Sequence, residues 1–250
     1  MPKPAWILNW TAALSDLLFP LGCLGCSAEG AWLCLACQQQ LPYNLSRHCP
    51  HCGAPTAGGE SCVPCRRGQA LDGALSFIPY AEPMAQSLIH AWKYQGIRSL
   101  SSQLGNFVTG GLTIIHNYPL LPTLLLDKNT GLVPVPLHKK KLRQRGFNQA
   151  HDLAQTVSNQ TGYPVLDIFE RTRHTTAQAT LQETDRFTNI HNAFCLKNNT
   201  GDLNGKNILI VDDVITTGAT IANLAKILKT AGVQSVWALT IAYGHPNKSS

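Results

Sequence analysis

Residues 208–220 read Ile208-Leu209-Ile210-Val211-Asp212-Asp213-Val214-Ile215-Thr216-Thr217-Gly218-Ala219-Thr220, and this stretch decides the fold. Its first four residues form a continuous apolar run, which is typical of a buried parallel strand and which we expect to stop before the two acids. A helix is predicted over 221–229, directly after a turn rich in threonine and glycine. Such a turn presents backbone amides, hydroxyls and the positive end of a helix dipole to one point, which suits a phosphate group.

The two adjacent carboxylates restrict the kind of ligand further. Asp212 and Asp213 would repel a phosphate that touched them, so they must face hydroxyl donors or a metal ion. A ribose diol meets that need, and the turn after the acids would then hold the phosphate of the same sugar. The alternative is a buried strand that ends in a solvated Asp-Asp helix cap. That alternative does not explain why the turn is rich in threonine and glycine. The predicted phosphate-binding residues are Thr216, Thr217, Gly218, Ala219 and Thr220.

The rest of the chain after residue 67 alternates between apolar runs and helical periodicity. Strands are predicted at 71–80, 131–135, 165–169, 206–211 and 235–242, and helices at 84–94, 100–115 and 148–159. Strands separated by helices predict an α/β fold with an open, mostly parallel sheet. Ligands of such sheets bind beyond the carboxyl ends of the strands, which is where the acid pair lies.

The first 65 residues contain eight of the nine cysteines, arranged as four CxxC pairs. Two CxxC turns complete the tetrahedral set of four thiolates that zinc prefers, so we expect two closed, structural zinc sites. Sequential grouping is the first choice, and an interleaved grouping stays open. Disulfides are the alternative, which the lack of a secretion signal disfavours. The sequential grouping places Cys23, Cys26, Cys34 and Cys37 on one ion and Cys49, Cys52, Cys62 and Cys65 on the other.

Charge and hydropathy add limits on partners and location. The net charge is +6, and five of the 20 basic residues lie within 139–145, where they form a cationic patch that favours phosphate-bearing partners. No apolar stretch reaches the roughly 18 residues of a membrane-spanning helix, so we expect no membrane insertion and a cytoplasmic protein. We expect residues 1–67 to form an N-terminal helix with a double zinc-ribbon module, and residues 68–250 to form the α/β domain. The cationic patch consists of Lys139, Lys140, Lys141, Arg143 and Arg145.

The acid pair with its phosphate turn resembles the signature of the type I phosphoribosyltransferases. Two further blocks, residues 132–137 and Arg145-Gly146-Phe147-Asn148-Gln149, resemble the ComF family, also called GntX-like, of competence-associated phosphoribosyltransferases. The cysteine module followed by Leu41-Pro42 is similar to the zinc ribbon of that family. A downstream block also resembles the family, through Arg171, Thr172, Arg173, Gln178, Leu181, Arg186, Asn189 and Phe194.

The resemblance implies a ligand and roles for several residues. The ligand would be 5-phosphoribosyl pyrophosphate (PRPP) with Mg²⁺, the acids Asp212 and Asp213 would be catalytic, and the turn would hold the 5-phosphate. The loop after Pro136 would contact pyrophosphate, and the cationic patch could neutralise this leaving group, although not with all five side chains at once. A mobile flap over the site would include Arg171, Arg173, Gln178 and Arg186.

The implied function is a pentosyl transfer, associated with natural transformation, to an unidentified acceptor with release of pyrophosphate. Relatives that act on purine bases carry a carboxylate where this chain has Thr216, so we expect an already nucleophilic nitrogen or an acid–base group from another segment. The alternative is a cytoplasmic factor that binds single-stranded DNA without turnover, with Trp92, Tyr94 and Phe147 as stacking residues. Its partners would include competence helicases or recombination proteins. A third reading is a degenerate transferase fold kept for protein contacts.

Overall fold

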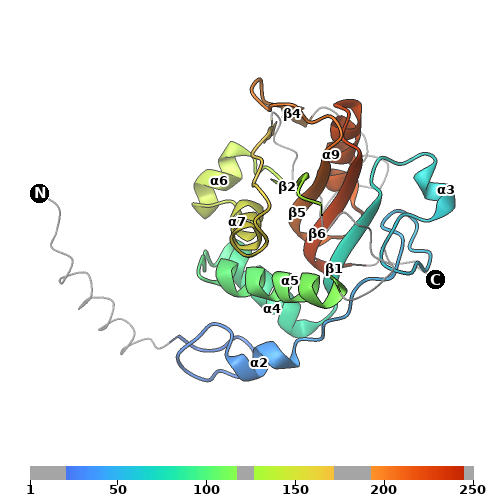
Figure 1. Cartoon of the computed structure of the whole chain (residues 1–250). Coiled ribbons are helices and arrows are strands. Elements are labelled where there is room, and N and C mark those ends of the chain that lie inside the picture. Colours follow the sequence, from blue (N-terminus) through green and yellow to red (C-terminus); the bar gives the residue numbers. More distant parts are fainter. Residues whose placement is uncertain (1–20, 117–126, 172–192, 245–250) are drawn as a thin grey trace, which may run out of the picture. The chain divides into compact units, whose positions relative to one another are not determined.

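The computed structural model describes residues 21–116, 127–171 and 193–244, and Figure 1 draws the remainder as a thin grey trace. The chain forms two compact units, Met1–Pro42 and Tyr43–Ser250. The first unit contains the first four cysteines and the short helix α2 (Leu35–Gln40). The second contains the other cysteine group with helix α3 (Val63–Arg66), together with the sheet. The domain boundary near residue 67 stays a prediction, and the helix expected within 6–19 lies outside the described residues.

The centre of the second unit is a sheet in which four described strands pair in the order β1-β6-β5-β2. All three pairings are parallel, which confirms the predicted open parallel sheet. The strands are β1 (Gly73–Pro79), β6 (Ser235–Tyr243), β5 (Asn207–Ile215) and β2 (Thr130–Pro134).

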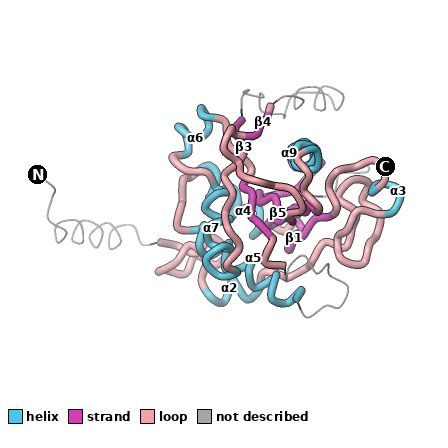
Figure 2. Tube along the Cα trace, turned by 45° about the horizontal axis from the view of Figure 1, so that its top comes forward, coloured by secondary structure: helices cyan, strands magenta, loops and turns pink. Residues whose placement is uncertain are grey.

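Helices cover both faces of this sheet, as Figures 1 and 2 show. Helix α9 packs on one face, where Leu224 and Leu228 join Ile208 and Ile210 of β5 in one buried cluster. Helices α4, α5 and α7 lie on the other face. Because both faces are buried, the strands read as nearly continuous apolar runs. The helices are α4 (Pro83–Tyr94), α5 (Leu100–His116), α6 (Lys139–Arg145), α7 (Gln149–Thr161) and α9 (Ala219–Thr230).

Strand β5 continues through the acid pair to Ile215, so the predicted strand end at residue 211 is wrong. The reason is the neighbouring strand β6, which supplies backbone partners beyond the apolar run. Asp212 pairs in register with Thr240, and Val214 pairs with Ala242. The acids are therefore held on the last residues of a strand, and the turn of the motif begins only at Thr216.

Two further elements differ from the predictions. Residues 139–145, expected in a loop, form helix α6, which begins where His138 Nδ1 accepts the Lys140 N–H at 3.2 Å. The helix ends at Gly146, whose positive φ of 80° suits glycine. The strand predicted over 165–169 is reduced to one bridge between Val165 and Leu132. A separate two-stranded sheet follows, in which β3 (Phe169–Arg171) pairs antiparallel with β4 (Phe194–Leu196).

The segment that carries the second cysteine group runs along the outer side of β1. Asn44 N–H donates to Phe77 O at 2.7 Å, and Ser46 N–H donates to Ser76 O at 2.8 Å. Further along the strand, Ala74 N–H donates to Gly59 O at 2.9 Å. These bonds join the cysteine group to the sheet by backbone contacts. Among the described residues, no helix combines the length and the apolar character needed to cross a membrane.

Candidate functional site

The acid pair lies at the carboxyl end of β5, and its two side chains point to opposite faces because neighbouring strand residues alternate. Asp213 is buried, with 8% of its surface exposed, and forms an ion pair with Lys93 from the last turn of α4. Asp212 is half-buried, and its Oδ1 accepts the backbone N–H of Asp213 at 2.9 Å. The two acids therefore share one site but have different partners.

These surroundings separate the two acids electrostatically. Burial raises the pKa of Asp212 well above its usual range, and the neighbouring Asp213 carboxylate raises it further. Burial also opposes ionisation of Asp213, but the Lys93 ammonium and the hydrogen bonds to the carboxylate together leave the pKa of Asp213 below its usual value. Burial likewise disfavours the charged form of Lys93, yet Asp213 raises the pKa of that lysine. Asp213 is therefore ionised while Asp212 holds its proton more tightly.

Two further cations surround Asp212. Burial lowers the pKa of Lys141, on α6, and the Arg171 guanidinium lowers it again, while the Asp212 charge opposes this shift. Burial also lowers the pKa of Arg171, on β3, and Asp212 again acts in the other direction. Lys93, Lys141 and Arg171 thus come from three separate elements to one pair of acids. Of these, sequence reasoning missed Lys93, although it is the only formally charged residue of its helix, and that is the signal that could have marked it.

Helix α6 divides the cationic patch into two faces. Lys141 and Arg145 are half-buried and one helical turn apart, and the Arg145 guanidinium lies 5.2 Å from the centre of the Tyr94 ring. Both residues line a cavity of about 330 Å³ together with Lys93 and Tyr94, and we call it the cationic cavity. The other members of the patch, Lys139, Lys140 and Arg143, are exposed. Only two of the five predicted basic residues therefore lie on the side of the acid pair.

The predicted phosphate turn joins the end of β5 to the start of α9. Thr216 and Thr217 are exposed. Gly218 is the N-cap residue of α9 and has a left-handed conformation with a φ of 67°. Glycine is favoured there because a side chain would be strained at this φ. The cap residue Gly218 makes no side-chain hydrogen bond to the start of α9, and N–H groups at the start of a helix attract anions. The turn thus has the physical properties of an anion-binding site.

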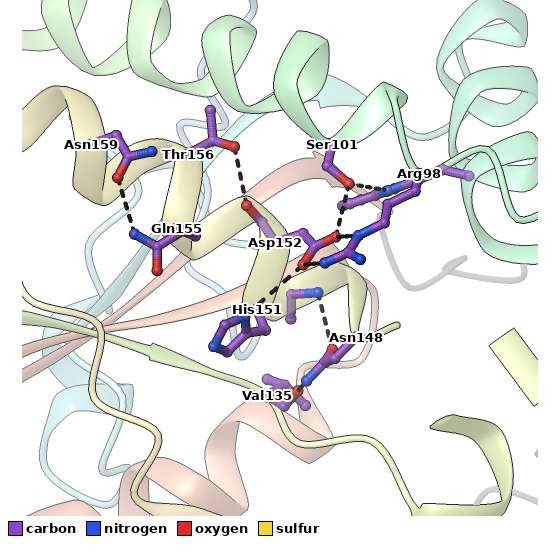
Figure 3. A network of polar contacts seen from close by, with 11 residues as sticks. Arg98, Ser101, Val135, Asn148, His151, Asp152, Gln155, Thr156 and Asn159 are labelled. Carbon is purple, nitrogen blue, oxygen red and sulfur yellow. Dashed lines mark hydrogen bonds and ion pairs between the residues drawn. The ribbon is translucent and has the colours of Figure 1, made fainter. Parts of the chain in front are cut away.

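Within the block Arg145–Gln149, Asn148 has a structural part (Figure 3). Asn148 accepts the Ala150 N–H at the start of α7 and donates to Val135 O at 3.1 Å, which ties the helix to the end of β2. In α7, Asp152 accepts two bonds from Arg98, at 2.6 and 3.0 Å. Ser101 Oγ lies 3.5 Å from the same carboxylate. The network holds the corner between α4 and α5 against α7, close to Lys93.

Two of the three predicted stacking residues are corrected by burial. Trp92 is fully buried and donates to Ser101 Oγ at 2.9 Å, and Phe147 is 6% exposed beneath Arg98. Neither ring can stack on a nucleic-acid base, whereas Tyr94 is 67% exposed. Among the predicted flap residues, Arg171 lies on β3, and Arg173, Gln178 and Arg186 fall outside the described residues.

Eight cysteines form two groups, in the sequential grouping: the first four along the chain form one group and the next four form the other. In each group the four sulfur atoms lie within 4.8 Å of one another, and the closest pairs, Cys26 with Cys34 and Cys52 with Cys62, are 3.6 Å apart. Zinc–sulfur bonds of about 2.3 Å place tetrahedral sulfurs about 3.8 Å apart, so both groups fit a structural zinc ion. Burial opposes ionisation of Cys23, but backbone N–H groups of neighbouring residues lower the pKa of its thiol to about 6. His48 and His51 belong to neither group.

Comparisons with known proteins agree with this geometry. The family model described as phosphoribosyl transferase domain matches residues 142–249, and the double zinc ribbon domain model matches residues 14–66. The chain is therefore a phosphoribosyltransferase-domain protein with a double zinc ribbon and a fold of the type I kind.

Full-length relatives identify the family. Competence protein F of Haemophilus influenzae is 32% identical over 218 residues, which cover 84% of this chain and 90% of that protein. The DNA utilization protein YhgH of Escherichia coli is 31% identical and covers 85% and 92%, and Competence protein ComFC of Bacillus subtilis is 29% identical and covers 80% and 79%. The chain belongs to the competence-associated ComF family.

Proposed function

We propose that this protein binds PRPP together with Mg²⁺ and transfers the phosphoribosyl group to an acceptor, with release of pyrophosphate. The observation that carries the proposal is the acid pair at the end of β5, which is followed at once by an anion-binding turn and is surrounded by Lys93, Lys141 and Arg171. Such a set has complementary partners for each part of PRPP. The family model and the ComF relatives support the same assignment.

The sugar and its phosphate would lie at the acids and the turn. The N–H groups at the start of α9 and the hydroxyls of Thr216, Thr217 and Thr220 would hold the 5-phosphate, with Gly218 and Ala219 allowing close backbone approach. Asp212 and Asp213 would accept hydrogen bonds from the ribose diol. Because both acids belong to a buried strand, the ring would be fixed in orientation before the reaction.

The leaving group would lie on the side of α4 and α6. The cavity of about 330 Å³ there is lined by Lys93, Lys141 and Arg145, and among the described residues no acid lines its wall. When the bond between C1 and the pyrophosphate oxygen breaks, the electron pair leaves with pyrophosphate, and these cations stabilise the added charge. The lone pair of the acceptor forms the new bond at C1.

The donor set of the acid pair fits Mg²⁺, because carboxylate oxygens are the ligands that this hard cation prefers. Asp212 and Asp213 are the residues that would hold it. A bound Mg²⁺ would supply charge neutralisation at the pyrophosphate group. The Lys93 ammonium balances the charge of Asp213, as the ion pair indicates.

Calorimetric titration of the full chain with PRPP and Mg²⁺ tests the proposal, followed by an assay for pyrophosphate release. We expect Asp213→Asn to reduce PRPP affinity by at least about a hundredfold, since it removes a charged hydrogen-bond partner. Asp167→Asn is the matched control, because Asp167 is exposed and paired with Lys197. Wild-type affinity in the Asp213→Asn protein would refute the proposal.

A second function, binding of single-stranded DNA, is favoured by one specific feature. The solvent face of α6 carries Lys139, Lys140 and Arg143, and the exposed ring of Tyr94 lies beside Arg145 of the same helix. Cations next to an exposed aromatic ring are what single strands require. Relatives named for competence and DNA utilization support this reading. The exposed cations of α6 are separate from those that line the cavity, whereas Tyr94 borders both regions.

A further inference from the structure

Gln149, the last residue of the block Arg145–Gln149, is a buried polar side chain with 3% of its surface exposed. It is the first residue of α7, and the neighbouring Asn148 ties this end of the helix to Val135 O at the end of β2. The Oε1 atom of Gln149 accepts a hydrogen bond from Nη1 of Arg145 at 3.2 Å. The side chain therefore connects a fixed helix start to a cation that lines the cationic cavity.

The bond from Arg145 settles how the Gln149 amide is oriented. A guanidinium group can only donate, so the amide oxygen must face Arg145 and the NH₂ group must face away. That nitrogen is buried and has no hydrogen-bond partner among the described residues. Because an unpaired buried donor costs about 1–3 kcal/mol, an apolar side chain of similar size would suit the folded chain at least as well. What the glutamine adds is its bond to Arg145.

Arg145 is held by two uncharged groups. Its guanidinium lies 5.2 Å from the centre of the Tyr94 ring and donates to Gln149. Among the described residues, no carboxylate lies within ion-pair distance of this guanidinium. Lys93, on the same cavity, is by contrast paired with Asp213. The full positive charge of Arg145 is therefore available to an anion in the cavity.

Arg145 needs to be held because the cations of the cavity repel one another. Lys93 and Lys141 line the same cavity as Arg145. Burial lowers the pKa of Lys141, and the charges of Arg171 and Arg145 lower it further. A guanidinium on a long, flexible side chain would turn from these charges towards solvent. A carboxylate would hold Arg145 but cancel its charge, whereas a neutral amide oxygen holds it and leaves the charge.

We propose that Gln149 is a positioning residue, which holds the Arg145 guanidinium at the cationic cavity for the diphosphate group of the ligand and, being neutral, leaves it charged. This inference rests on the proposed function, in which that cavity receives pyrophosphate. Gln149 acts through Arg145 and does not itself touch the ligand. Glutamate, which has nearly the same shape, should therefore fail to replace glutamine at this position.

Two substitutions test this role in the full chain. Gln149→Glu keeps the shape but offers Arg145 a carboxylate, and Gln149→Met removes both the acceptor and the unpaired NH₂ group. Gln155→Glu and Gln155→Met are the matched controls, because Gln155 lies exposed on the same helix and bonds to Asn159, four residues on. Calorimetry measures the affinities for pyrophosphate with Mg²⁺, for PRPP with Mg²⁺ and for ribose 5-phosphate, and thermal unfolding measures stability.

We expect each Gln149 variant to bind pyrophosphate and PRPP about tenfold more weakly, which is the scale of one hydrogen bond to a charged group. Ribose 5-phosphate has no diphosphate group and should bind as it does to the wild-type chain. Gln149→Met should unfold at no lower temperature than the wild-type chain. In an Arg145→Ala background, Gln149→Met should have no further effect on pyrophosphate affinity, because the two residues act as one unit.

Wild-type pyrophosphate affinity in both Gln149 variants would overturn the inference, and Gln149→Met decides alone if the buried carboxylate of Gln149→Glu prevents folding. An equal loss of ribose 5-phosphate affinity, a marked loss of stability in Gln149→Met, or an additive effect in the Arg145→Ala background would also overturn it. Each of these would mean a general disturbance of the fold. A wild-type chain that binds neither PRPP nor pyrophosphate would instead refute the proposed function.

Discussion

Asp212 and Asp213 are neighbours in the chain, yet the structure gives them opposite protonation preferences. Asp213 faces the Lys93 ammonium, which keeps its pKa low despite burial. The pKa of Asp212 is raised by burial and by the charge of Asp213, and the Lys93 ammonium offsets this only in part. Two acids whose surroundings move their pKa values apart are typical of functional sites. The unliganded protein therefore bears an electrostatic cost at Asp212, which a ligand or metal ion would relieve.

This cost predicts that Asp212→Asn stabilises the unliganded protein. Because the folded-state pKa of Asp212 is raised, its favourable contribution belongs to the protonated form and is lost as the pH rises through that pKa. Asparagine resembles the protonated form at every pH. We expect a gain of about 1 kcal/mol near neutral pH, or about 2–4 °C in Tm, that disappears towards pH 4. Thermal unfolding between these pH values measures it.

The control for this substitution is Asp167→Asn, which alters an exposed ion pair and should leave the Tm within about a degree. A loss of stability in Asp212→Asn at neutral pH would contradict the electrostatic account. The same variant should lose PRPP affinity, so stability and binding are expected to change in opposite directions at this residue.

At the residue scale the sequence predicts one half of the site better than the other. The acids and the turn are contiguous, and their chemistry can be recognised within residues 208–220. Lys93 lies 120 residues before Asp213 and meets it only because α4 packs beside the end of β5. No local pattern encodes such a contact. Arg171 was expected as part of a flap, and its place beside Asp212 likewise follows from tertiary structure.

At the element scale, helix α6 places the basic residues of 139–145 on two faces, whereas the sequence shows them as one continuous run. Its half-buried residues, Lys141 and Arg145, lie towards the cationic cavity, and its exposed residues lie towards solvent. The helical spacing of four residues produces this division. A loop, as predicted, would have left all five cations equivalent.

The division predicts separable losses. Replacing Lys139, Lys140 and Arg143 together by alanine should weaken binding of single-stranded DNA and lower the salt slope by about 2, which is about 0.7 for each phosphate contact. PRPP affinity should be unchanged. Lys141→Ala should do the reverse, and fluorescence anisotropy at several salt concentrations beside calorimetry measures both. The assignment fails if the triple variant binds DNA as the wild-type chain does.

The strands and helices themselves were largely predictable, because apolar periodicity reports burial. The end of β5 was not, since Asp212 and Asp213 have poor strand propensity and are held in the strand by their pairing with β6. Helix α6 was missed for a related reason. A run of like charges opposes an isolated helix, and α6 is held by its cap at His138, the turn at Gly146 and contacts such as Arg145 with Gln149.

At the scale of the whole molecule, the two cysteine groups have different places. The first belongs to the unit Met1–Pro42, whereas the second belongs to the unit that contains the sheet and the acid pair. Because the second group is joined to β1 by backbone hydrogen bonds, its metal ion supports the same cooperative structure as the site.

This difference predicts unequal effects of two serine substitutions. Cys52→Ser should destabilise the sheet-containing unit by about 3 kcal/mol or more, and should speed hydrogen exchange at Ala74, whose N–H donates to Gly59 O. Cys26→Ser, in the other unit, should leave exchange in β1 unchanged. Hydrogen exchange followed by mass spectrometry over residues 71–80 checks this. Equal protection of β1 in both variants would contradict the assignment.

The backbone bonds along β1 have one more consequence. They occupy the outermost N–H and C=O groups of the sheet, which would otherwise accept a strand from a second molecule. Release of metal from the second cysteine group would uncover that row of groups next to apolar residues of β1. The ribbon segment therefore covers a sheet edge that could otherwise add a strand from a second molecule, and we expect metal release to raise the tendency of the chain to aggregate.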